Sequence, residues 1–260
     1  MTMEVTVVGS GTLLPDDEHR SAGHLLESEW AAVLLDCGSG VVHGMAGIGL
    51  DWAAIDHVVL SHFHTDHFGD LAPLLWAWKH GVPEGRQRAR SILGPRGTGE
   101  LLGSLAEAHG DFILDPGFPL SVIELDPGSV WEHPSGELTI AAHSTPHTPE
   151  SLAFRVRMAG GDMGYTGDTG PHPPLGPFFE GVRLLIAECA VADSTGVDNH
   201  LSPSSLAEIA TVANPEILVV THMYPEVDRS TLPDLLRSMG VEGTVVLGED
   251  GFRFSLGPTE

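Results

Sequence analysis

The stretch His62-Phe63-His64-Thr65-Asp66-His67 decides how this sequence is interpreted. It directly follows an apolar run that predicts a β-strand. Residues two apart in an extended segment point the same way, so His62 and His64 can approach one metal ion from one side. A turn after them can direct Asp66 and His67 toward a second metal ion. Imidazole and carboxylate ligands without thiolates are typical of zinc sites, and manganese and iron also accept them.

Three further candidate ligands follow predicted strands far downstream: His147, Asp168 and His222. Because long stretches of chain separate them, only the fold can assemble them with the first four. His143 competes with His147, since both lie in the same His-Ser-Thr-Pro-His segment. The residues alone do not choose between the two. The family resemblance described next favours His147 as the ligand, and His143 is then expected to lie outside the ligand set.

In order and context these residues resemble the metallo-β-lactamase superfamily. Within it the chain is most similar to the branch that holds ribonuclease Z and small phosphodiesterases, and the early motifs Gly9-Ser10-Gly11-Thr12 and Leu35-Asp36-Cys37-Gly38 also match that branch. The resemblance spans roughly residues 4 to 255. It implies an α/β fold, the four-layer αββα sandwich, built as a single domain over residues 1–260.

The resemblance also assigns the candidate ligands to two divalent metal ions, with zinc favoured and manganese or iron as alternatives. A carboxylate shared by both ions would hold them about 3.5–4 Å apart, where they can also share a hydroxide that attacks the substrate. One ion would be held by His62, His64 and His147, the other by Asp66, His67 and His222, and Asp168 would bridge the two.

Three residues carry the expected catalytic roles. The resemblance implies that His200 protonates the leaving oxygen and that Glu188 is its hydrogen-bonding partner, which would keep the imidazole protonated at neutral pH. Asp66 would also orient the nucleophile or take its proton. The competing interpretation of His200 is a surface histidine ahead of a helix, and that of Glu188 is an ordinary carboxylate at a strand end.

Two departures from ribonuclease Z decide against RNA as the first choice of substrate. Ribonuclease Z inserts an arm that grips transfer RNA between the positions of His147 and Asp168, but only 20 residues lie between them here. In place of the histidine and threonine that usually surround the glutamate, the chain has Ala187 and Ala190. The chain has 12 Lys and Arg against 36 Asp and Glu, which gives a net charge of −24. It therefore lacks the basic residues for a positively charged surface that would bind a long nucleic acid.

The sequence therefore predicts a dinuclear metal-dependent hydrolase, a phosphodiesterase that acts on a small cyclic or nucleotide phosphodiester through a metal-bridging hydroxide. The first alternative is a ribonuclease Z-like endonuclease that processes RNA 3′ ends. The others are a lactone or sulfate-ester hydrolase and a non-catalytic, metal-dependent binding protein. The expected partner is a small molecule, with a homodimer as a further possibility.

Hydrophobic periodicity and turn residues predict the elements. Strands first cluster and then alternate with helices, which favours two packed sheets covered by helices on their outer faces. Cys37 and Cys189 lack the spacing of a disulfide framework or a thiolate metal site. We find no signal-peptide pattern and no membrane-spanning run, and expect a cytoplasmic protein without a membrane partner. The predicted strands are 4–8, 22–26, 31–35, 56–61, 92–93, 120–124, 138–143, 151–158, 162–165, 184–188, 217–221, 244–247 and 252–255, and the predicted helices are 39–48, 69–80, 97–109, 204–212 and 231–239.

Overall fold

The computed structural model describes residues 2–83, 87–158 and 161–257, which form two seven-stranded sheets packed face to face. The first sheet has the strand order β14-β1-β2-β3-β4-β5-β6 and the second β13-β12-β11-β10-β9-β8-β7. The strands of the first sheet are β1 (Met3–Gly9), β2 (Gly23–Glu27), β3 (Ala32–Leu35), β4 (His57–Val59), β5 (Arg90–Pro95), β6 (Leu120–Leu125) and β14 (Arg253–Leu256). Those of the second are β7 (Val130–Glu132), β8 (Leu138–Ser144), β9 (Leu152–Met158), β10 (Gly161–Tyr165), β11 (Leu184–Glu188), β12 (Ile217–Thr221) and β13 (Thr244–Leu247).

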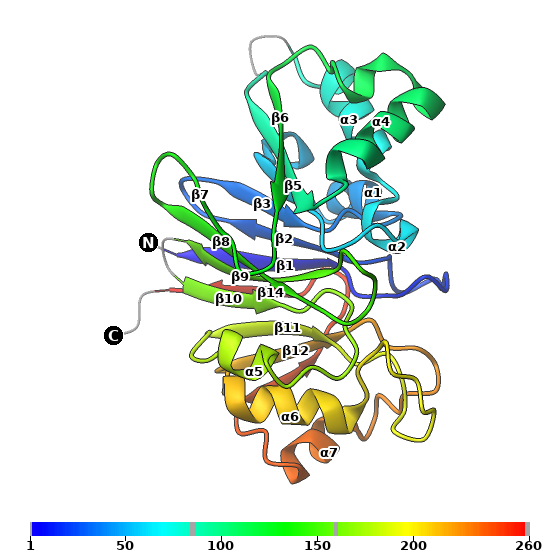
Figure 1. Ribbon diagram of the computed structural model, residues 1–260, viewed down its shortest axis with the longest axis vertical. Helices are drawn as coiled ribbons and strands as arrows, with labels where there is room; N and C mark the ends of the chain where they lie inside the picture. The colour runs from blue at the N-terminus through cyan, green and yellow to red at the C-terminus, as the bar shows by residue number, and fades with distance from the viewer. Residues whose placement is uncertain (1, 84–86, 159–160, 258–260) are drawn as a thin grey trace.

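Helices cover the outer face of each sheet, so the molecule has four layers (Figure 1). On the first sheet lie α1 (Val41–Gly47), α2 (Thr65–Phe68), α3 (Leu71–Gly81) and α4 (Thr98–His109), with short 3₁₀ turns at Trp52–Ala54 and Asp111–Ile113. On the second lie α5 (Leu175–Phe178), α6 (Pro203–Ala213) and α7 (Leu232–Ser238). This is the expected αββα sandwich, and the fold prediction is confirmed.

Three apolar layers hold this arrangement together. The central one lies between the sheets and joins side chains such as Val5 and Leu35 to Phe154 and Ile186. Each outer layer lies between a sheet and its helices. The parallel strands β11 and β12 are covered on both faces, which explains why their sequences are continuous apolar runs instead of alternating patterns. Among the described residues, no helix is both long and apolar enough to cross a membrane.

Besides the two 3₁₀ turns, three elements of the described chain were not predicted from the sequence. The four-residue helix α2 occupies the expected turn after His64, and α5 occupies a segment expected as a loop. Strand β7 was missed because it is an edge strand whose side chains are largely exposed, so it shows no apolar run. The 20-residue interval between His147 and Asp168 folds as predicted, as strands β9 and β10 paired in antiparallel register with Met158 opposite Gly161. Residues 159–160, which join them, lie outside the described part of the chain.

Candidate metal centre and active site

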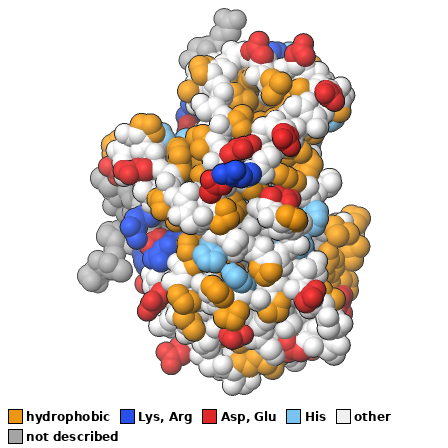
Figure 2. Space-filling model, viewed as in Figure 1, with side chains coloured by type: hydrophobic (Ala, Val, Ile, Leu, Met, Phe, Trp, Pro, Cys, Tyr) orange, Lys and Arg blue, Asp and Glu red, His pale blue; other side chains and the backbone are white. Residues whose placement is uncertain are grey.

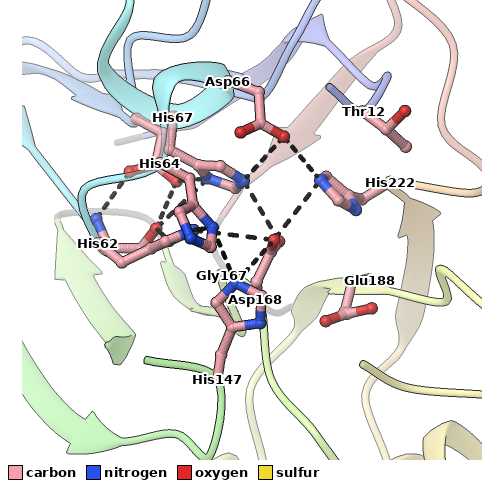
Figure 3. A network of polar contacts seen from close by, with 12 residues as sticks. Thr12, His62, His64, Asp66, His67, His147, Gly167, Asp168, Glu188 and His222 are labelled. Carbon is pink, nitrogen blue, oxygen red and sulfur yellow. Dashed lines mark hydrogen bonds and ion pairs between the residues drawn. The ribbon is translucent and has the colours of Figure 1, made fainter. Parts of the chain in front are cut away.

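The site lies where loops leave several strands at one edge of the two sheets. His62 and His64 follow β4, and α2 carries Asp66 and His67 immediately after them. The other residues follow strands β8, β10 and β12 of the second sheet, where β10, β11 and β12 are parallel and end at the same edge. Figure 3 shows that all seven side chains predicted as ligands point toward one another; the three from the second sheet are His147, Asp168 and His222.

The first group consists of three imidazole nitrogens and a carboxylate. His62 Nε2 and His147 Nε2 each lie 3.0 Å from His64 Nδ1, and Asp168 Oδ2 lies 3.8 Å from His62 Nε2 and 3.6 Å from His147 Nε2. Burial lowers the pKa of both His62 and His147, which favours neutral rings with a free lone pair. These four residues place their ligand atoms within 4.8 Å of one another, so they could hold one metal ion.

The second group consists of Asp66, His67 and His222, whose ligand atoms also lie within 4.8 Å of one another. Asp66 Oδ2 is 3.3 Å from His222 Nε2 and 3.9 Å from His67 Nε2. Asp168 faces this group as well, since its Oδ1 lies 3.3 Å from His67 Nε2 and its Oδ2 lies 3.6 Å from His222 Nε2. The carboxylate of Asp168 therefore stands between the two groups.

Hydrogen bonds behind the histidines fix which nitrogen faces the site. His67 Nδ1 donates to Asp36 Oδ2 over 2.7 Å, and His147 Nδ1 donates to the carbonyl oxygen of Asn199 over 2.8 Å. Each bond leaves the Nε2 lone pair of the ring for the centre, an arrangement that metal-ligating histidines share.

Asp36 is the residue at this site to which the sequence had assigned no role. Its fully buried carboxylate accepts bonds from the backbone and hydroxyl of Ser61, each over 2.7 Å, and from the Tyr165 hydroxyl over 2.6 Å, in addition to that from His67. Its backbone has a φ of 56°, which is uncommon for a residue other than glycine. A carboxylate directly after a buried strand was the available signal, because such a group needs several donors.

Unpaired buried atoms test whether metal ions fit the residues present. His67 Nε2 and Asp168 Oδ1 are buried and face each other, yet neither has a hydrogen-bond partner among the described residues. Leaving a buried polar atom unpaired costs about 1–3 kcal/mol. Two divalent cations, one per group, would satisfy both atoms and would match the oxygen and nitrogen donors around them. The residues present therefore fit such a pair, and the cluster is a His/Asp metal-binding site.

Buried Glu188 and half-buried His200 form a pair beside the cluster. His200 Nδ1 lies 3.0 Å from Glu188 Oε1, and that carboxylate also accepts backbone N–H bonds from Thr169, Ala190 and Leu201. Burial alone would lower the pKa of His200, but the hydrogen bond to Glu188 and its charge raise it above the ordinary value. The His200 ring lies 4.8 Å from that of His147 and 5.7 Å from that of His222, measured between ring centroids.

His143 lies away from the cluster. Its Nδ1 donates to the carbonyl oxygen of Ser144 over 2.8 Å, and its ring packs against His172 and Phe178. The structure thus brings His147, and not His143, to the other candidate ligands.

Comparison with known proteins places the chain in a class of metal-dependent hydrolases. The family model described as "Beta-lactamase superfamily domain" matches residues 31–223, which is most of the chain. The chain therefore belongs to the β-lactamase superfamily of metal-dependent hydrolases with the metallo-β-lactamase fold.

Ribonuclease Z enzymes are among the proteins that the chain is similar to, as the sequence motifs indicated. Ribonuclease Z of Mycolicibacterium gilvum (strain PYR-GCK) is 28% identical, and the match covers 98% of this chain and 97% of the relative. The metallo-β-lactamase fold protein YhfI of Bacillus subtilis is 26% identical with a TM-score of 0.84, covering 98% of this chain and 100% of that one. The short form of human tRNase Z, 21% identical with a TM-score of 0.76 over 98% of this chain and all of its own, shares the fold. The predicted resemblance is confirmed.

Proposed function

We propose that this protein is a dinuclear phosphodiesterase that hydrolyses a small phosphodiester. The observation that carries the proposal is the Glu188–His200 pair, because it places a hydrogen-bonded imidazole beside two adjacent metal-ligand groups. A phosphodiester needs both parts: cations for its non-bridging oxygens and an acid for its leaving oxygen. In this proposal His62, His64 and His147 hold one cation, Asp66, His67 and His222 hold the other, and Asp168 bridges them. Zinc is the favoured metal.

When bound, the two cations would supply a nucleophilic water at neutral pH and would hold the phosphoryl oxygens. Residues of the chain itself transfer the protons and orient the reacting groups. Asp66 Oδ2 faces the centre and accepts a proton from the attacking water or orients that water. Glu188 holds the His200 ring through Nδ1, so Nε2 is the atom that delivers a proton to the departing oxygen. The backbone N–H bonds to Glu188 fix the carboxylate and keep this geometry rigid.

The first test is turnover of bis(p-nitrophenyl) phosphate by protein loaded separately with zinc and with manganese. We expect metal-dependent release of p-nitrophenolate, and a fall of about a hundredfold or more in the Asp66→Asn variant, because its neutral amide neither accepts the proton nor binds the second cation as a carboxylate does. Asn has the same shape as Asp, so the melting temperature of the variant serves as the control for folding. Absence of turnover with both metals, at about two bound ions per chain, would contradict the proposal and favour a lactone or sulfate ester.

His200→Ala tests the proton donor through its dependence on the leaving group. Alkoxide leaving groups need a proton, so turnover of a methyl or nucleoside leaving group should fall by about 10²–10⁴-fold. p-Nitrophenolate departs without a proton, so turnover of its diesters should fall far less. Equal losses on both substrates would show that His200 acts on structure or metal binding and not as the acid.

RNA 3′ processing is the second candidate, because the ribonuclease Z relative matches this chain over nearly its whole length. The net charge of −24 and the 20-residue interval between His147 and Asp168 weigh against it. Incubation of the metal-loaded protein with a precursor transfer RNA at low salt separates the two, because phosphate contacts are strongest there. We expect neither binding nor cleavage. Cleavage at the 3′ end of the transfer RNA would replace the small-diester proposal.

A further inference from the structure

The loop between β1 and β2 borders the site and carries two exposed leucines. We call residues 12–20 the leucine loop; Leu13 is 60% exposed and Leu14 46%. Figure 3 shows Thr12, at its start, on the Asp66 and His222 side of the cluster. Hydrophobic side chains gather at the right-hand edge of the space-filling view in Figure 2, at the height where Figure 1 draws this loop.

Two cavities lie against the leucine loop, and both adjoin the cluster. One, of about 340 Å³, is bounded by Leu13, Leu14 and Pro15 on one side and by Thr65 and Asp66 on the other. The second, of about 470 Å³, shares Leu14 and extends to Met223 and Tyr224, beside His222. Volumes of 300–1,000 Å³ are typical of pockets for small molecules. Leu14 borders both cavities, so its side chain can contact a ligand in either one.

The base of the loop is fixed, so these walls are already in place. The Gly11 N–H donates to the carbonyl oxygen of Arg20 over 2.7 Å, which closes the loop. Asp250, in the turn before β14, accepts bonds from the backbone and hydroxyl of Ser10, each over 2.9 Å, and from the backbone of Arg20 over 2.8 Å. The carbonyl oxygen of Ser10 in turn accepts the N–H of His222 over 2.8 Å, which ties the loop to the cluster.

Both arginines that line the two cavities already have a carboxylate partner. The Arg20 guanidinium lies 2.9 Å from Asp250, and that of Arg229 lies 2.7 Å from Glu249. His19 contacts both Asp16 and Glu249 at 3.1 Å. Among the described residues, the cavities therefore offer apolar surface and paired charges, but no unpaired cation for a second phosphate.

From these observations we propose that the leucine loop selects phosphodiesters whose retained ester group is apolar, an aryl or alkyl group, over those that carry a further phosphate. The inference rests on the proposed function, because it assigns the reacting phosphate to the metal-ligand groups. The smaller cavity touches Thr65 and Asp66 but not His200, which in the proposal serves the leaving group. It therefore suits the ester group that stays on phosphorus.

Three diesters that share a p-nitrophenolate leaving group test this selection. They are phenyl p-nitrophenyl phosphate, thymidine 5′-(p-nitrophenyl phosphate) and the same thymidine ester with an added 3′-phosphate, and the last two differ only in the extra phosphate. We expect kcat/KM to be highest for the phenyl ester and about tenfold lower for the 3′-phosphorylated thymidine ester than for its parent, since the extra charge meets no cation. Equal values across the three substrates would overturn the inference.

Substitutions at Leu14 assign the preference to the loop. Leu14→Asn should lower kcat/KM for the phenyl ester about tenfold, the scale of discrimination that a small hydrophobic contact provides. Leu14→Met should keep the preference because its side chain stays apolar. Leu114→Asn is the matched control, a leucine of similar exposure, 56%, that borders neither cavity. Equal effects of the two asparagine variants would remove Leu14 from the specificity site.

A binding measurement separates failure of this inference from failure of the proposed function. Calorimetry with zinc-loaded protein compares diphenyl phosphate with dimethyl phosphate and needs no turnover. We expect about tenfold tighter binding of the diphenyl ester, lost in Leu14→Asn. Tighter binding without turnover of any diester would overturn the diesterase proposal and leave the apolar selection standing. Turnover with equal binding of the two esters would overturn the selection alone.

Discussion

At the scale of single residues, the site depends on side chains whose partners are also buried. The sequence motifs identified the seven candidate ligands because each follows a predicted strand in a family context. The family resemblance identified Glu188, at the end of a predicted strand, and His200, ahead of a predicted helix. They did not identify Asp36 as the partner of His67, or the Asn199 carbonyl oxygen as the partner of His147. Those contacts join residues far apart in the chain, and no local pattern contains them.

His57 provides a residue-scale prediction for stability against pH. It is buried, its Nδ1 lies 2.6 Å from Ser91 Oγ, and Trp131 and His133 pack against its ring. Burial lowers the pKa of His57 to about 4, with Asp56 opposing the shift and His133 and Arg88 adding to it. The unfolded chain therefore binds a proton below about pH 6.5 that the folded protein does not.

The stabilisation from neutral His57 should accordingly be present at pH 7 and fall as the pH drops through 6.5 toward 4. From pH 7 to pH 5 this residue alone should remove about 2 kcal/mol from the free energy of unfolding. Urea titration of the metal-free protein at several pH values checks this against His57→Asn, whose amide can still bond to Ser91 but does not titrate. Parallel pH profiles for the two proteins would contradict the prediction.

At the scale of elements, the sequence predicted nearly every strand because buried strands carry continuous apolar runs. It missed α2, since four residues do not show a helical period and this helix depends on its surroundings. The Cys37 N–H donates to the carbonyl oxygen of His67 over 2.7 Å, and the Asp70 N–H donates to that of Cys37 over 2.9 Å. Backbone contacts from the loop after β3 therefore hold the helix that carries Asp66 and His67.

Gly38 tests that contact between elements. A Cβ at this position would lie 2.0 Å from the carbonyl oxygen of Asp66 and 2.8 Å from that of Ala22, so α2 would have to move. We expect Gly38→Ala to cost about 1–3 kcal/mol of stability and to weaken metal binding measurably. Gly47→Ala, in α1, is the control, because nothing lies within 4 Å of its Cβ position and it should be neutral or stabilising. Zinc affinity and melting temperature are measured for both variants. Both quantities should fall in Gly38→Ala and neither should fall in Gly47→Ala.

At the scale of the whole molecule, two sheets contribute to one centre, and neither holds a complete set of ligands. The first sheet supplies the His62–His67 segment, and the second supplies His147, Asp168 and His222. The sequence predicted the layers but not the distances between loops, because those depend on how the sheets pack across their shared core. The cavities beside Leu13 and Leu14 also became visible only in the folded protein, because their walls come from segments that lie far apart in the sequence.

The division of the ligands between the sheets also has a consequence in time. During synthesis the His62–His67 segment leaves the ribosome first, and His222 follows His67 by 155 residues. Until β10 and β12 have formed, the nascent chain is a partial chelator that lacks Asp168 and His222. Metal ions should therefore exchange freely with the growing chain and become fixed only once both sheets are joined. A ribosome-stalled chain that ends before β10 should release zinc to a chelator that the folded protein resists.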